Sequence, residues 1–391
     1  MIPFEKALEI TLNSAITSGT ERVGIFAACQ RILAEDLHSD VSMPPFNKSA
    51  MDGYACRKSD IMNGLEVIEE IAAGALPVKT VGKNQCSRIM TGAMVPKGAD
   101  CVIMKEDIEE IAPGRVKCMN ENSKTNICYE GEDVTKGDLV LKKGIQLSPA
   151  SVAILAAIGC TNPLVYKLPR IAILSTGDEL VEPDQIPGLS KIRNSNGYQL
   201  AAQVLQMGIL CDYLGIVADN EVSVKTVLTR TLRLYDVTII SGGVSVGDFD
   251  FVPTVLKQLE VNIRVHGMEV RPGKHLLFGE RANHFVFGMP GNPVSSFVQF
   301  EVLVKPFLHA LTGKTSVSDM LYLSVDEDYV RKKGDQLIFV PVTLTNQGKV
   351  LPLDYHGSAH IQAYTMAQGI MEVPKGVSII KKGEIVCVRP L

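Results

Sequence analysis

Two segments of the chain combine acidic side chains with glycine and serine, a mixture that suits binding of a charged oxyanion. The first is Ser175-Thr176-Gly177-Asp178-Glu179, and the second runs from Ser241 to Asp250. Glycine and serine let backbone N–H groups approach an anion closely. Carboxylates would be repelled by the same anion and would raise one another's pKa unless a cation lies between them. Because Mg²⁺ takes oxygen ligands and bridges to phosphate, the two segments predict a Mg²⁺-dependent phosphate site.

Either segment alone also fits a turn that only caps a helix. Both, however, follow short apolar runs typical of buried strands, and ligands of open parallel sheets bind beyond the carboxyl ends of the strands. Two such segments at one sheet edge therefore favour a ligand site. The site is not a dinucleotide site of the usual kind, since the chain has neither a G-x-G-x-x-G turn opening a helix here nor a Walker A motif.

Cations and a further glycine-rich turn follow downstream. Arg271-Pro272-Gly273-Lys274 places two positive charges around a tight turn, and Gly288 to Ser296 leads into a predicted helix. The free N–H groups of a helix start suit an oxyanion. Read in isolation, Arg271 and Lys274 also fit a solvated surface turn.

Three further motifs lie in the first third of the chain. Asn47 to Ala55 follows a diproline and contains Asp52, Thr91-Gly92-Ala93 is a short polar turn, and Gly131-Glu132-Asp133 is a second acidic turn. Asp52 and Asp133 could each be simple turn formers.

The elements around these motifs divide the chain into regions of different pattern. Strands over 171–174, 211–217 and 237–240 alternate with helices over 197–207, 220–234 and 293–311, which predicts a doubly wound α/β domain. Residues 45–140 and the segment after Gly313 read as β-rich. The remaining pieces predict helices over 4–17, over 23–33 and after Ser148-Pro149, where serine suits the N-cap and proline the first helical position.

Bulk composition limits the function classes. The chain has 391 residues, a formal net charge of −4 and a pI of about 6.0, which gives no sign of a nucleic-acid surface. It begins without a basic, apolar secretory signal, and its most apolar run, 152–159, is too short to cross a membrane, so we expect a cytoplasmic protein with no membrane partner.

The nine cysteines are odd in number and lack C-x-x-C spacing, which favours free thiols. His356 and His360 could form a metal pair but fit a polar loop better.

Taken together and in this order, the motifs resemble those of the MoeA proteins, the molybdopterin molybdenumtransferases, which are similar to the gephyrin E domain. The resemblance covers essentially the whole chain. It implies a multidomain α/β plus β fold: an elongated helical domain in two pieces (1–44 and 135–168), an inserted β-rich domain (45–134), a doubly wound molybdopterin-binding α/β domain (169–313) and a C-terminal β-barrel-like domain (314–391). It also implies a homodimer whose cleft joins the α/β domain of one subunit to the inserted domain of the other.

The implied reaction inserts molybdate into adenylated molybdopterin, with Mg²⁺-dependent release of AMP, and a molybdopterin adenylyltransferase is an implied partner protein. Carried over by motif, the catalytic carboxylates are Asp52, Asp133, Glu179, Asp219 and Asp250, of which Glu179 and Asp250 would hold Mg²⁺. Asp219 also fits a helix cap. The implied substrate-binding residues are Thr91, Gly242, Gly243, Ser245, Asp248, Arg271, Lys274, Pro290, Asn292, Pro293 and Ser295.

One departure and two alternatives accompany the resemblance. Many family members carry an arginine shortly before Gly131-Glu132-Asp133, whereas residues 126–130 contain none. If that arginine binds an anion in the family, either another cation serves in its place here or this chain uses a modified substrate contact. The chain could instead be a molybdopterin adenylyltransferase, although that enzyme needs neither the inserted nor the C-terminal domain. It could also be a gephyrin-like scaffold, although a scaffold would not need Asp52, Glu179 and Asp250 together.

Overall fold

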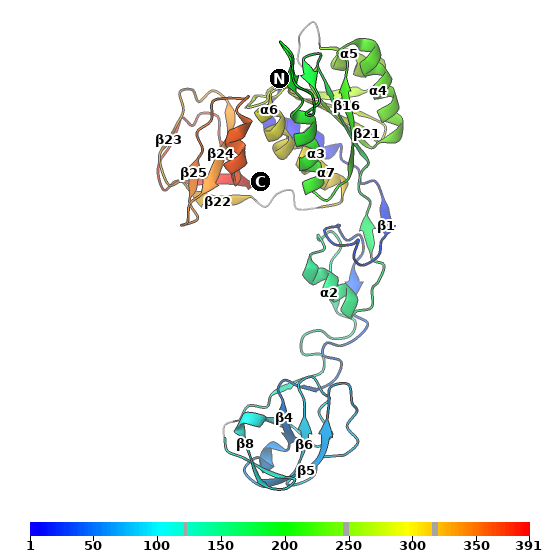
Figure 1. Cartoon of the computed structure of the whole chain (residues 1–391), viewed down its shortest axis with the longest axis vertical. Coiled ribbons are helices and arrows are strands. Elements are labelled where there is room, and N and C mark those ends of the chain that lie inside the picture. The colour runs from blue at the N-terminus through cyan, green and yellow to red at the C-terminus, as the bar shows by residue number, and fades with distance from the viewer. Residues whose placement is uncertain (121–122, 245–249, 315–319) are drawn as a thin grey trace.

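The computed structural model describes residues 1–120, 123–244, 250–314 and 320–391. The molecule is elongated, with a small β-rich lobe at one end, a narrow stalk in the middle and a larger head at the other end (Figure 1). We define the lobe as residues 45–134, the stalk as 15–44 with 135–168, and the head as 1–14 with 169–391. The chain runs from the head down the stalk into the lobe and back again. No described helix is long and apolar enough to cross a membrane.

The lobe is built around one six-stranded sheet with the order β7-β4-β6-β5-β9-β8. Its strands are β4 (Gly53–Cys56), β5 (Gly64–Ile71), β6 (Gln85–Ile89), β7 (Cys101–Met104), β8 (Ile108–Ala112) and β9 (Arg115–Cys118), with the short pair β3 (Lys48–Ser49) and β10 (Ile127–Cys128) and the 3-10 turns Lys58–Asp60 and Lys105–Asp107. Four of the nine free cysteines, Cys56, Cys86, Cys101 and Cys118, are buried in its core. They behave as small apolar residues there.

The stalk consists of two antiparallel strand pairs and one helix. β1 (Thr20–Arg22) pairs with β12 (Leu164–Tyr166), and β2 (Leu37–His38) pairs with β11 (Leu139–Leu141). The helix is α2 (Pro149–Ala157), with Ser148 at the N-cap and Pro149 at the first helical position, as predicted. The structure adds that Ser148 and Ser151 cap each other reciprocally. The predicted helix over 23–33 is wrong, because this segment forms turns and short bridges instead.

The head contains the predicted doubly wound sheet, with the strand order β16-β13-β17-β21-β20-β18. The first four strands run parallel to one another, β20 runs antiparallel to them, and β18 pairs antiparallel with β20. The strands are β13 (Ile171–Thr176), β16 (Cys211–Val217), β17 (Val237–Ser241), β18 (Asn262–His266), β20 (Leu277–Arg281) and β21 (His284–Met289), and the small pair β14 (Leu180–Val181) and β15 (Ile192–Arg193) lies beside them.

Helices cover both faces of this sheet because its buried strands alternate their apolar side chains between two cores. Ile173 and Ile239 face one core, and Leu174 and Ile240 face the other. The first core receives α3 (Asn196–Gln206), α6 (Pro293–Gln299), the π-helical turn Phe300–Val304 and α7 (Lys305–Leu311); the second receives α4 (Glu221–Leu234) and α5 (Phe251–Gln258). Asn220 caps α4 as predicted.

The C-terminal part adds a second β-structure to the head. Its sheet has the order β19-β24-β26-β28-β22, formed by β19 (Val270–Arg271), β22 (Leu321–Ser324), β24 (Leu337–Leu344), β26 (Gly369–Val373) and β28 (Ile385–Pro390). Smaller elements are β23 (Tyr329–Val330), β25 (Val350–Pro352), β27 (Ile379–Ile380) and the 3-10 helix Ile361–Met366. The N-terminal helix α1 (Phe4–Asn13) packs in the head, where the rings of Phe4 and Phe339 contact each other edge-on with their centroids 5.3 Å apart. The predicted multidomain α/β plus β fold is therefore confirmed.

Candidate functional site

The carboxyl ends of three neighbouring parallel strands meet at one pocket of the head. β13 ends before Gly177, β17 before Gly242 and β21 before Pro290, and these turns line a cavity of about 350 Å³. The pocket also contains the carboxylates of Glu179, Asp219 and Asp250, so we name it the acidic pocket. The head carboxylates selected from the sequence thus lie together.

Glycine is required where the β17 turn passes under β13. Gly242 has φ +94°, and a Cβ atom there would lie 2.2 Å from the carbonyl oxygen of Thr176. Gly243 also has a positive φ, of +63°. The amide of Gly242 already donates to the carbonyl of Met289 at 3.1 Å, so this residue shapes the turn rather than offering a free N–H to a ligand.

The carboxylates of the acidic pocket repel one another. Burial raises the pKa of Asp219, and the nearby charges of Asp178, Asp250 and Glu179 raise it further. The hydroxyl of Thr176 partly offsets this rise by donating to Asp219 Oδ1 at 3.1 Å. A bound cation would relieve the repulsion.

The donor set fits a hard divalent cation that shares its ligands with a substrate. Within the described part of the chain, no three acidic, histidine or cysteine side chains are close enough to enclose a metal ion. Mg²⁺ is usually held by one or two carboxylates together with phosphate oxygens and water, so the pocket fits Mg²⁺ only when phosphate is present.

A second pocket adjoins the first and carries the opposite charge. It has a volume of about 420 Å³ and contains Arg271, Lys274 and Ser295, and we name it the cationic pocket. Asn292 and Pro290 line both pockets. Arg271 is oriented by Gln336, whose Oε1 accepts from its Nε at 2.7 Å.

The structure adds residues that the sequence analysis missed. His275 lines both pockets, and burial together with the charge of Lys274 lowers its pKa, so the ring is neutral near neutral pH. Its position directly after Lys274 was the available signal. Tyr355, Gly357 and Ser358 reach the cationic pocket from the C-terminal part, and no local pattern marked them.

The lobe residues lie far from these pockets. Asp52 accepts hydrogen bonds from the amide of Thr91 at 2.8 Å and from its hydroxyl at 2.7 Å, which hold the pKa of Asp52 below its usual range. Lys105 Nζ lies 3.6 Å from the same carboxylate. Asp133 is exposed at the junction of lobe and stalk, where its amide donates to the carbonyl of Met43. The lobe and the head stand at opposite ends of the molecule (Figure 1), so one chain does not bring the two groups together.

The remaining residues that the sequence suggested for a site differ in where the structure places them. Pro293 begins α6 beside the cationic pocket, as predicted for the turn before that helix. Ser245 and Asp248 fall outside the described residues. His356 and His360 stack with ring centroids 5.2 Å apart, and the amide of His356 donates to Nδ1 of His360, which is a loop contact.

The chain is similar to known proteins over almost its whole length. Residues 2–159 match the MoeA N-terminal region (domain I and II), residues 172–310 a probable molybdopterin binding domain, and residues 327–391 the MoeA C-terminal region (domain IV). The molybdopterin molybdenumtransferase of Staphylococcus epidermidis is 33% identical, over 98% of this chain and 94% of its own length; that of Staphylococcus aureus is 32% identical over the same shares. The solved MoeA protein of Pyrococcus horikoshii OT3 is similar with a TM-score of 0.85 at 29% identity, covering 100% of both chains.

Proposed function

The chain belongs to the MoeA family of molybdopterin molybdenumtransferases, and from this premise we propose that it completes the molybdenum cofactor by inserting molybdate into adenylated molybdopterin, with release of AMP. We further propose that it does so in the cytoplasm, as a Mg²⁺-dependent homodimer supplied by a molybdopterin adenylyltransferase. The parts of this proposal rest on separate observations.

The main observation behind the proposal is that the acidic and cationic pockets adjoin each other. The reaction needs a phosphoanhydride and a tetrahedral dianion close to each other. Arg271 and Lys274 would attract molybdate, since fixed cations suit an oxyanion, and the acidic pocket would receive the phosphoanhydride. His275, Pro290 and Asn292 would lie at the junction between the two substrates.

The carboxylates would act on the phosphoanhydride end. Glu179 and Asp250 would hold Mg²⁺, which when bound neutralises charge on the phosphate oxygens. Asp219 is half-buried and would orient water toward the phosphorus atom, with its position fixed by the hydroxyl of Thr176. Gly242 and Gly243 let the β17 turn lie close to the phosphate.

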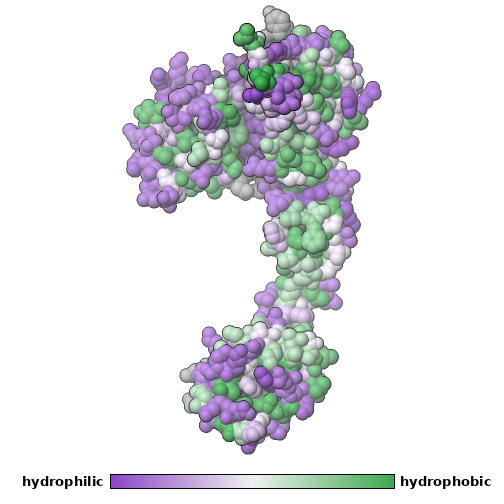
Figure 2. Space-filling model, in the orientation of Figure 1, coloured by the Kyte–Doolittle hydropathy of each residue, from purple (hydrophilic) through white to green (hydrophobic). Residues whose placement is uncertain are grey.

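Asp52, Thr91 and Asp133 would enter the site from a second subunit. In one chain they are remote from Glu179, so a shared site requires a partner lobe. Large apolar side chains left exposed support self-association: Phe26 of the stalk is 90% exposed, and Ile186 and Leu189 of the head are 89% and 98% exposed. Hydrophobic surface also gathers on the stalk in Figure 2.

Lys48 is our candidate for the cation that replaces the missing family arginine. It pairs across the β3–β10 ladder with Cys128, and both Lys48 and Asp133 lie close enough to affect the pKa of that thiol. Lys48 therefore stands beside the acidic turn where the arginine would otherwise be.

The direct test follows AMP release from adenylated molybdopterin in the presence of Mg²⁺, with and without molybdate. We expect molybdate-dependent release, reduced at least about 100-fold by Glu179→Ala and by Asp250→Ala, since each removes charge placed at the reacting phosphate. Glu260→Ala is the matched control, because its side chain is 82% exposed and lies outside both pockets.

Other outcomes would replace the proposal. Consumption of ATP with formation of adenylated molybdopterin would identify an adenylyltransferase. Tight binding of the pterin without AMP release in any condition would identify a scaffold that retains the fold.

A further inference from the structure

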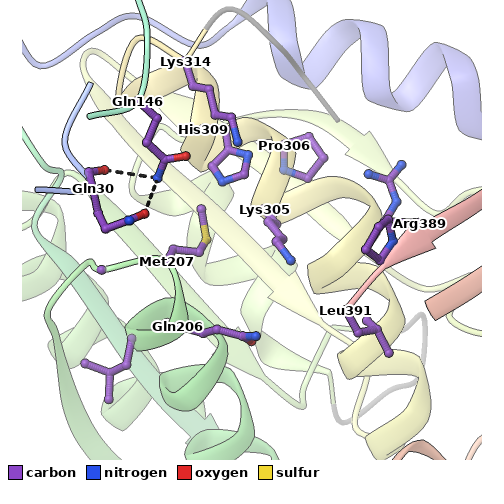
Figure 3. Close-up of a pocket in the computed structure, with 13 residues that line it drawn as sticks. Gln30, Gln146, Gln206, Met207, Lys305, Pro306, His309, Lys314, Arg389 and Leu391 are labelled. Atoms are coloured by element: carbon purple, nitrogen blue, oxygen red, sulfur yellow. Dashed lines mark hydrogen bonds between the residues drawn. The ribbon is translucent and has the colours of Figure 1, made fainter. Parts of the chain in front are cut away.

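A third pocket lies where the stalk meets the head, and the proposed reaction does not use it. Its volume is about 460 Å³. Gln30 and Gln146 line it from the stalk, while the end of α3, the helix α7 and the last residues of β28 line it from the head (Figure 3). We name it the junction pocket. None of its residues lines the acidic or the cationic pocket.

Basic side chains gather around the junction pocket. Lys305, Lys314 and Arg389 surround the hollow together with the ring of His309 (Figure 3). The charge of Lys305 is matched, because its Nζ lies 2.7 Å from the buried carboxylate of Glu301. Neither Lys314 nor Arg389 forms an ion pair with any residue that the structure describes.

Arg389 is the most unusual of these groups. Its Nε is buried and has no hydrogen-bond partner among the described residues. Burial lowers the pKa of the guanidinium, and Glu301 and Glu372 offset this without forming an ion pair with it. Arg389 is half-buried and lines the pocket, and a partly desolvated guanidinium without an ion-paired partner among the described residues is costly to a fold, so this arrangement favours an anion in the pocket.

Neutral, hydrogen-bonding side chains from the stalk and from the end of α3 also line the pocket. The side-chain amide of Gln146 donates to Gln30, to its carbonyl at 3.2 Å and to its Oε1 at 3.0 Å. Gln206 and Met207 add to this lining from the end of α3 (Figure 3). A cavity of this size, lined by basic side chains together with amides and a thioether, suits a small organic molecule with one anionic group.

We propose that the junction pocket binds a small organic phosphate of about nucleotide size, with its phosphate on Arg389 and Lys314 and its body against Gln30, Gln146 and Met207. Two cations without an ion-paired partner in the described part of the chain match the double charge of a phosphate monoester, and the planar guanidinium suits bidentate contact with its oxygens. Such a ligand contacts stalk and head at once, so its binding restrains one relative to the other. This inference is independent of the proposed reaction.

Calorimetric titration of the full-length protein tests the proposal with three probes: inorganic phosphate, AMP and adenosine. We expect AMP to bind, inorganic phosphate to bind more weakly and to compete with it, and adenosine not to bind measurably. Arg389→Gln and Lys314→Gln should each weaken AMP binding at least about tenfold. Lys314→Gln keeps the test valid if Arg389→Gln fails to fold.

Two controls locate the binding. Lys333→Gln changes an exposed lysine of the C-terminal part outside the pocket and should leave the affinity unchanged. Glu179→Ala should also leave it unchanged, because AMP held as a product would depend on the acidic pocket. Equal loss in Glu179→Ala, tight binding of adenosine, or unchanged affinity in Lys314→Gln and a folded Arg389→Gln would each overturn the proposal.

Discussion

The hydroxyl of Thr91 orients a neighbouring side chain, the carboxylate of Asp52. It donates to the same Asp52 oxygen that the Thr91 amide contacts, and so fixes the orientation of an otherwise exposed carboxylate. Thr91→Val should lower the rate of AMP release by about 10- to 100-fold, the usual cost of losing an orienting partner. Thr91→Ser restores the hydroxyl and should recover most of the activity. Equal activity of the valine and serine variants in the AMP-release assay would contradict this role.

His284 should make the head sensitive to mild acid. Its Nδ1 donates to the carbonyl of Tyr235 at 2.7 Å, so its Nε2 accepts from Thr238 at 3.0 Å and the ring is neutral. Burial lowers its pKa. As the pH falls, His284 is therefore protonated in the unfolded chain before it is protonated in the folded one. The stability that the neutral ring contributes is complete above the unfolded pKa of about 6.5, and it is lost as the pH falls through the lowered pKa of the folded state.

Thermal unfolding at a series of pH values would check this dependence. The melting temperature should fall more steeply between pH 7 and pH 5 in the native protein than in His284→Asn, which keeps a hydrogen-bonding side chain but does not titrate. Parallel curves for the two proteins would show that His284 is not the responsible group.

Site residues could be predicted from the sequence where they belong to a local motif. Residues that reach a pocket only because distant parts of the chain fold together were missed. Glu179, Gly242 and Asn292 follow strands whose ends could be read directly, and all three line the acidic pocket. Tyr355 and Arg389 come from the C-terminal part, and no local pattern ties either one to its pocket.

Among the elements, α2 depends on its cap. Ser148 accepts from the amide of Ser151 at 3.2 Å, and the hydroxyl of Ser151 accepts from the amide of Ser148 at the same distance. Ser148→Ala should cost about 1 kcal/mol and speed hydrogen exchange of the α2 amides about fivefold. Exchange in α4, capped independently by Asn220, serves as the internal control. Acceleration in α4 as well would mean that the substitution acts globally.

The turn after β17 should not tolerate a side chain at Gly242. Alanine there would occupy a left-handed conformation and press against the Thr176 carbonyl, so Gly242→Ala should cost about 1–3 kcal/mol from the backbone alone, with a further clash. Gly291→Ala changes another glycine of the same pocket, with open space around it, and should stay within about 0.5 kcal/mol. Thermal unfolding of both variants makes the comparison. Equal stability of the two would contradict the geometry of the turn.

Elements were predictable where the sequence carries a clear local signal, such as a continuous apolar run or a helix-capping residue. The strands and caps of the head agree closely, since Cys211–Val217 and the helix beginning after Asn220 stand where the pattern placed them. The segment 23–33 has an apolar pattern that also fits a helix, but its amides pair with a distant part of the stalk: Gln30 donates to Leu147 and Leu33 to Ile145. Gln30 adopts φ +66°, which ends any helix.

At the scale of the whole molecule, the distance between lobe and head makes the shared site testable. A dimer assembled from one Asp52→Asn chain and one Glu179→Ala chain contains one site with both residues intact and one with neither. If two-fold symmetry places each lobe at the partner's head, this heterodimer, purified through two different tags, should show about half the activity of the native dimer. Each homodimeric variant should be inactive. No recovery in the heterodimer would contradict a site shared between subunits.

The path of the chain also sets the order in which the protein can be completed during synthesis. The helix α1 packs against β18 and α7, and the ring of Phe4 also contacts Phe339 of β24, so its partners are all synthesised late. At roughly 5–20 residues per second, the 250 to 300 or so residues that separate α1 from β18 and α7 take about 13–60 s, during which the stalk and lobe emerge. A nascent chain that stalls before β18 therefore carries an uncovered apolar helix near its start, an early binding site for a chaperone that only the last third of translation removes.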